Sequence, residues 1–133
     1  MPLAIEILTP SRLLLQDQVD ELNVPGADGY LGVLPGHTAL LTTLGQGVLM
    51  YRKGEQRQYI ALFGGYMEVN NDKVTLLADL AEKADEIDRP RAEAARERAE
   101  EHLRRRDIDI DYERAQAALM RSLIRLQTAG HHA

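Results

Sequence analysis

The sequence contains no cysteine, and aromatic residues make up only 5% of the chain. The absence of cysteine excludes a disulfide framework, a zinc–thiolate site and a cysteine nucleophile. The few aromatic rings, together with a formal net charge of −5, argue against a free-standing nucleic-acid-binding module, because such modules use stacking rings and positive charge. Any site for an anion must therefore be local.

The sequence also has little that would direct or anchor the chain in a membrane. Its first residues, MPLAIEILTP, lack the basic and apolar regions of a signal peptide. No apolar run approaches the roughly 20 residues of a membrane-spanning helix. We therefore expect a soluble chain that meets a membrane only through a larger assembly.

The motifs of common catalytic and nucleotide-binding folds are missing as well. There is no G-x-x-x-x-G-K-[ST] loop and no G-x-G-x-x-G. Neither Ser11 nor Ser122 lies in a nucleophile elbow, and the histidines show no metal-ligand spacing. The acidic pair Asp109 and Asp111 falls between two predicted helices, where helix capping explains it. The sequence therefore predicts no catalytic residue, no metal site and no enzymatic activity.

Residues 1–85 show the pattern of short strands. Ile5 and Ile7 alternate with Ala4 and Glu6, which is the period of a strand buried on one face. Turn signals recur about every ten residues; they are Ala27-Asp28-Gly29, Pro35-Gly36, Lys53-Gly54-Glu55 and Asn70-Asn71-Asp72. This spacing predicts an all-β N-terminal domain, a flattened antiparallel β-sandwich or barrel.

Residues 86–133 are rich in alanine, glutamate and arginine and contain no glycine before Gly130. This composition favours helix. The segment RRDIDID, residues 105–111, divides the second half into two predicted helices, about 89–105 and 111–127.

The predicted helix starts carry recognisable capping residues. Pro90 suits the first turn of the first helix, because its missing N–H has no partner there in any case. Asp88 or Arg89 would be the N-cap of that helix, and Asp109 or Asp111 would cap the second.

Each predicted helix carries a narrow stripe of small and apolar residues. The stripes consist of Ala92, Ala95, Ala99 and Leu103 on the first helix, and of Ala115, Leu119, Ser122 and Leu126 on the second. Stripes this narrow let two helices pack closely, and the short connection makes the helices antiparallel. The second half is therefore predicted to be an αα-hairpin.

Four arginines fall on one edge of this predicted hairpin. At about 100° per residue, Arg91 and Arg98 lie to one side of the first stripe, and Arg121 and Arg125 lie to the same side of the second. Antiparallel packing brings the two flanks to a common edge, within about 10 Å along the helix axis. We therefore expect four guanidinium groups to cluster near the open end of the hairpin.

Arginines on helices are usually solvated and paired with acids three or four residues away. Glu100 and Glu101 precede Arg104 and Arg105 by four residues and supply such partners. Arg121 and Arg125 are different, because neither has an acid within four residues on its own helix. An unpaired guanidinium cluster favours an anion, either a polyphosphate or an acidic loop of a partner.

Three segments occur in a specific order: DGYLGVLPGHTALLTTLGQGVL (28–49), FGGYMEVNNDKVTLLAD (63–79) and EIDRPRAEAARERAEEHL (86–103). Together they resemble the epsilon subunit of bacterial F-type ATP synthase, over nearly the whole chain. The resemblance implies a non-catalytic subunit whose β-sandwich, residues 1–85, attaches to the gamma subunit and the c-ring in the rotor's central stalk. It also implies a peripheral location at the cytoplasmic face of the bacterial cell membrane, in a complex that couples proton transport to ATP synthesis.

In some bacterial members of that family, ATP binds the folded hairpin through a pattern I/L-D-x-x-R-A. Ile87-Asp88-Arg89-Pro90-Arg91-Ala92 matches this pattern, with an added charge and a stiffening proline in the variable pair, and Arg89 is expected to face solvent. Carried over position by position, the resemblance implies that the ATP contacts are Glu82, Asp88, Arg91, Ala92, Arg98, Arg121 and Arg125. The four arginines of this set are those that helix geometry already places on one edge.

The resemblance makes ATP a regulatory ligand, with no cofactor required. The arginines would neutralise phosphates, while Glu82 and Asp88 could accept hydrogen bonds from the adenine amino group or the ribose hydroxyls. Bound ATP would stabilise the folded hairpin. Without it, the hairpin would extend along gamma to the catalytic alpha and beta subunits and hinder ATP hydrolysis. The alternative is a purely structural coupling subunit that does not bind ATP.

Overall fold

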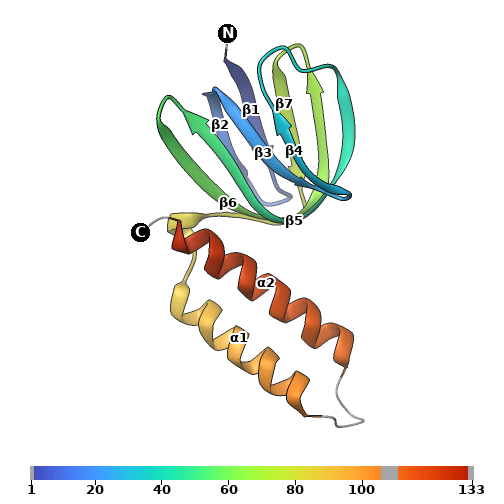
Figure 1. The fold of residues 1–133 in the computed structure, drawn as a ribbon, viewed down its shortest axis with the longest axis vertical. Helices are drawn as coiled ribbons and strands as arrows, with labels where there is room; N and C mark the ends of the chain where they lie inside the picture. The colour runs from blue at the N-terminus through green and yellow to red at the C-terminus, as the bar shows by residue number, and fades with distance from the viewer. Residues whose placement is uncertain (1, 106–110, 132–133) are drawn as a thin grey trace.

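The computed structural model describes residues 2–105 and 111–131. A β-domain is followed by two helices that lie side by side on one side of it (Figure 1). The elements are β1 Leu3–Leu8, β2 Leu13–Val19, β3 Glu21–Gly26, β4 Gly29–Val33, β5 Leu40–Lys53, β6 Gln56–Asn70, β7 Lys73–Ala78, β8 Ala81–Lys83, the 3₁₀ turn η1 Ala84–Glu86, α1 Arg89–Arg104 and α2 Tyr112–Gly130. The expected fold class, a β-sandwich followed by a helical hairpin, is confirmed.

The strands form one sheet that folds over on itself to make the two layers of the sandwich. Seven strands pair in the order β2-β1-β7-β6-β5-β3-β4, and β8 pairs with β6. One pair departs from the expected antiparallel arrangement: β1 and β7 run parallel. Since these strands are far apart in the sequence, no hairpin turn constrains their relative direction.

The long strand β6 contributes to both layers because it bends at a glycine pair. Its residues Ile60–Leu62 pair with β8, whereas Gly65–Asn70 pair with β7. Gly65 has a φ of +128°, and a Cβ at this position would come within 2.1 Å of the carbonyl oxygen of Leu77. Only glycine fits at this bend without displacing the neighbouring strand.

The core of the sandwich follows from the alternation seen in the sequence. Along β1, the residues Leu3, Ile5 and Ile7 are buried, while Ala4 and Glu6 are partly exposed. The predicted period is therefore confirmed for this strand. The same inward alternation buries the largest core side chains of the other strands, among them Leu22, Leu49, Ile60, Leu62, Met67 and Leu76.

Both helices begin at an aspartate N-cap. The carboxylate of Asp88 accepts a hydrogen bond from the backbone N–H of Arg91 over 3.1 Å, and Asp111 accepts one from the N–H of Arg114 over 3.1 Å. These contacts select Asp88 over Arg89, and Asp111 as the second cap; the other candidate, Asp109, lies outside the described residues.

The hairpin packs on the sandwich through α2. The small stripes meet between the helices, with Ala92, Ala99, Ala115 and Ser122 buried. Ile124 lies on a different face of α2 and packs into a cluster with Val48, Ala61 and Phe63 of the sandwich. Helix α2 therefore contacts both α1 and strands β5 and β6, and it joins the hairpin to the β-domain (Figure 1).

Within the described ranges, neither helix is long and apolar enough to cross a membrane.

Candidate functional site

A cavity of about 350 Å³ lies where the sandwich meets the start of α1 and the second half of α2. Its lining consists of Glu82, Glu86, Ile87, Asp88, Arg91, Ala92, Ala95, Arg98 and Arg125. Glu82 belongs to β8, whereas Arg125 belongs to α2. The complete cavity therefore requires the hairpin to be folded against the β-domain.

Most of the residues implied by the sequence pattern come together in this cavity. Six of them line it: Glu82, Asp88, Arg91, Ala92, Arg98 and Arg125. Arg121 is half-buried one turn before Arg125 on α2 and is not among the lining residues. The structure thus gathers three of the four edge arginines around one cavity.

Three lining residues were not among the predicted contacts: Glu86, Ile87 and Ala95. Ile87 stands in the I/L-D-x-x-R-A pattern, so the pattern itself could have indicated it. The position of Glu86 at the cavity is fixed by its contact with Arg12, which is 74 residues away in the sequence. No local pattern shows such a partner.

Arg125 is not unpaired, contrary to the expectation from its own helix. Its Nε donates a hydrogen bond of 2.7 Å to Oε1 of Glu82. Its guanidinium carbon lies 5.0 Å from the centre of the Phe63 ring, within range of a cation–π contact. The expectation was wrong because the acidic partner comes from β8, 43 residues earlier in the chain.

Glu86 is held at the cavity wall by two elements. Arg12 donates to both of its carboxylate oxygens, over 2.7 Å from Nη1 and 3.0 Å from Nη2, and the backbone N–H of Lys83 donates over 3.0 Å. The hydrogen bonds from Arg12 lower the pKa of Glu86 below its ordinary value of 4.5. This bidentate pair ties the β1–β2 turn to η1, immediately before the hairpin.

The lowered pKa gives the Arg12–Glu86 pair an acid-sensitive contribution to stability. A carboxylate whose folded-state pKa lies below its unfolded-state pKa contributes stability above about pH 4.5, and this contribution is lost as the pH falls through the folded-state pKa. We expect the Glu86→Gln variant to lose stability less steeply than the parent chain between about pH 5 and 3, measured by urea unfolding at each pH. Arg12→Gln should flatten the profile in the same way; parallel profiles for all three proteins would contradict this assignment.

The cavity has positive charge that is available to a ligand, because its acidic side chains already have partners within the protein. Two of the three lining carboxylates form ion pairs, Glu82 with Arg125 and Glu86 with Arg12. The third, Asp88, accepts the capping hydrogen bond from a backbone N–H of α1. Arg91 and Arg98, by contrast, form no ion pair with any residue of the described ranges. The dipole of α1, which begins at this cavity, also favours an anion.

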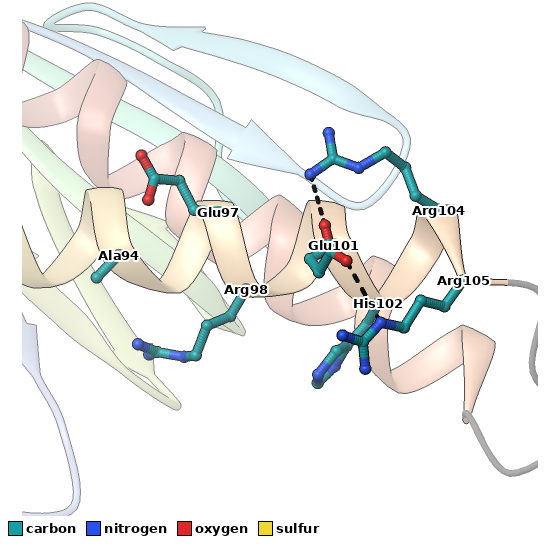
Figure 2. Close-up of a pocket in the computed structure, with 7 residues that line it drawn as sticks. All are labelled: Ala94, Glu97, Arg98, Glu101, His102, Arg104 and Arg105. Atoms are coloured by element: carbon teal, nitrogen blue, oxygen red, sulfur yellow. Dashed lines mark hydrogen bonds and ion pairs between the residues drawn. The ribbon is translucent and has the colours of Figure 1, made fainter.

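The arginines of α1 outside this edge do have partners. Arg89 was expected to face solvent, but its guanidinium donates to the carbonyl of Ala129 over 3.0 Å, so it also caps the last turn of α2. Figure 2 shows the other end of α1, where Glu101 lies between Arg104 and Arg105. The predicted pairing is confirmed for Arg105 with Glu101. It was wrong for Arg104, which pairs with Glu101 three residues before it, because Glu100 pairs with Arg96 instead.

Comparison with known proteins agrees with this architecture. The family model of the ATP synthase delta/epsilon chain β-sandwich domain matches residues 2–84, and that of the delta/epsilon chain long α-helix domain matches residues 85–130. The chain is 48% identical over 127 residues to the ATP synthase epsilon chain of Solibacter usitatus, covering 96% of this chain and 95% of that relative. It is 49% identical over 129 residues to the epsilon chain of Geotalea daltonii, covering 96% and 94%.

A solved structure of the Euglena gracilis mitochondrial ATP synthase contains a similar fold. The match has a TM-score of 0.81 at 23% identity and covers 98% of this chain and 82% of that chain. The identity is low, so this likeness concerns the fold alone. Because the two family models cover nearly all of the sequence, the chain belongs to the ATP synthase delta/epsilon family.

Proposed function

We propose that this chain is the epsilon subunit of a bacterial F-type ATP synthase, a non-catalytic part of the rotor's central stalk. The bacterial relatives named epsilon chain support this assignment. The fold itself also occurs in ATP synthase assemblies that include the c-ring. In this role the β-sandwich binds the gamma subunit and the c-ring. The chain then lies at the cytoplasmic face of the cell membrane without entering it, as part of the complex that couples proton transport to ATP synthesis.

The folded hairpin binds ATP in the cavity between β8, α1 and α2. The observation that carries this proposal is that Arg91 and Arg98 form no ion pair within the part of the chain that the structure describes, although the carboxylates beside them have protein partners. A guanidinium group has a planar set of donors that matches two phosphate oxygens. Glu82 and Asp88 offer acceptors for the adenine amino group or the ribose hydroxyls.

ATP binding in this cavity regulates the position of the hairpin. Because both domains contribute to the lining, ATP binds the folded hairpin and not the extended one. A ligand at 100 times its Kd stabilises the state that binds it by about 2.7 kcal/mol. A fall in ATP concentration therefore releases the hairpin, which extends along gamma to the catalytic alpha and beta subunits and hinders ATP hydrolysis.

One observation favours a second candidate, a purely structural coupling subunit without ATP binding. The ion pair between Arg125 and Glu82 joins α2 to β8 of the sandwich through protein groups alone. In that case the edge arginines contact acidic surfaces of protein partners.

Titration of the purified chain with ATP separates the two candidates. We expect calorimetry to show one ATP bound per chain, because the cavity has one set of edge arginines. Amide chemical shifts should change in residues 88–98 and around Arg125, and they should change little in β3 and β4. Absence of both heat and shift changes at millimolar ATP would reject the ATP site and leave the structural subunit.

A further inference from the structure

A second groove, of about 450 Å³, lies between α1 and α2 nearer to the connection that joins them. Its charged and polar lining consists of Arg98, His102, Arg114 and Asp111, and its remaining lining residues are alanines. Arg98 also lines the proposed ATP cavity, so the two spaces adjoin at this side chain.

The groove has positive charge that is available to a ligand. Of the described residues that line it, Asp111 alone carries a carboxylate, and this group accepts the capping hydrogen bond from the N–H of Arg114. Neither Arg98 nor Arg114 forms an ion pair with a residue of the described ranges. Figure 2 shows Arg98 and His102 extending from the same side of α1, one turn apart, whereas Glu97 extends from the other side.

Arginine and histidine side chains continue the edge of the hairpin beyond the proposed ATP cavity. Arg91 and Arg98 are seven residues apart, which corresponds to about 10 Å along the helix. His102 lies about 6 Å further, and Arg114 faces the same groove from α2. A row of donors therefore runs along the edge from the open end of the hairpin towards its connection.

We propose that this groove is a second phosphate-binding position, and that it acts with the first cavity to bind a linear polyphosphate chain longer than a triphosphate. Guanidinium groups from both helices contact phosphate oxygens, and the alanine side chains leave room for the chain between them. An extended acidic peptide fits less well, because alanine side chains offer no partners for the N–H and C=O groups of its backbone. The contribution of the first cavity rests on the proposed function, whereas anion binding by the groove does not.

The test is a calorimetric titration of the full chain with ATP, tripolyphosphate and a long-chain inorganic polyphosphate. We expect the long chain to bind at least about tenfold more tightly than tripolyphosphate, because it reaches both positions. Arg114→Ala should weaken binding of the long chain about tenfold and leave ATP and tripolyphosphate unchanged. Arg91→Ala should weaken all three ligands.

Arg104→Ala is the matched control, because it removes one positive charge from the same end of the hairpin but outside the groove. It should change the affinity for the long chain by less than about twofold. Equal losses from Arg104→Ala and Arg114→Ala would overturn the proposal, and so would an unchanged affinity in Arg114→Ala.

If ATP does not bind but the long chain binds through Arg114, the ATP site fails and the groove stands. If ATP binds and the long chain has no advantage over tripolyphosphate, the groove fails and the ATP site stands.

Discussion

Replacing Arg91 by alanine is expected to weaken ATP binding to the chain by about ten- to a hundredfold. A hydrogen bond to a charged group contributes about 1.5–3 kcal/mol, and each 1.4 kcal/mol corresponds to about a factor of ten in affinity. Arg91 is exposed and forms no ion pair within the described ranges, so the substitution removes a ligand contact without breaking a contact between the domains. Calorimetry of the purified variant with ATP measures the loss.

The choice of Arg91 separates ligand contact from folding of the hairpin. Arg125→Ala should also weaken ATP binding, but it removes the ion pair with Glu82 and the contact with Phe63 at the same time. Arg104→Ala, at the far end of α1, is the control and should leave the affinity for ATP unchanged. If both Arg91→Ala and Arg125→Ala bind ATP like the parent chain, the site assignment is wrong.

Replacing Ile124 by alanine is expected to release the hairpin from the sandwich. Ile124 is 5% exposed and packs against Val48, Ala61 and Phe63, and truncation of a buried isoleucine to alanine typically destabilises by about 2–5 kcal/mol. This loss falls on the contact between α2 and the β-domain, not on the core between the layers. Hydrogen exchange should therefore accelerate at least about tenfold in α2, with little change in β1 and β7.

Leu123 provides a matched control for this variant. It is the neighbouring residue on α2 but is 43% exposed, so Leu123→Ala should have little effect on exchange. Equal acceleration of hydrogen exchange in both variants would show that opening of α2 does not depend on its contact with the sandwich. Protected α2 amides in Ile124→Ala would show that this side chain does not hold the hairpin. Under the proposed function, Ile124→Ala should also lower the apparent affinity for ATP, because fewer molecules have a complete cavity.

Features with a short repeat along the chain could be predicted from the sequence. Alternation in β1 assigns Ile5 and Ile7 to the core, and helical periodicity assigns Arg91 and Arg98 to one edge of α1. Both follow from backbone geometry, since side chains repeat every two residues in a strand and every 3.6 residues in a helix. Asp88 was one of two predicted candidates for the first cap for the same reason, because its partner lies three residues away, and the structure decided between it and Arg89.

Contacts between distant parts of the chain could not be predicted in this way. The partner of Arg125 lies on β8, and the partner of Glu86 lies in the β1–β2 turn. No periodicity relates such residues, because their meeting depends on how the hairpin packs against the sandwich. The same packing places Ile124 on the β-domain and leaves Arg121 outside the cavity.

Sequence therefore suffices for the fold class, for the helix starts to within one or two residues, and for the common edge of Arg91, Arg98 and Arg125. The docking of α2 on β5 and β6 determines which arginines are neutralised and which remain available. That distinction depends on tertiary structure, because an ion pair needs its two charged groups within about 4 Å of each other, whatever their separation along the chain.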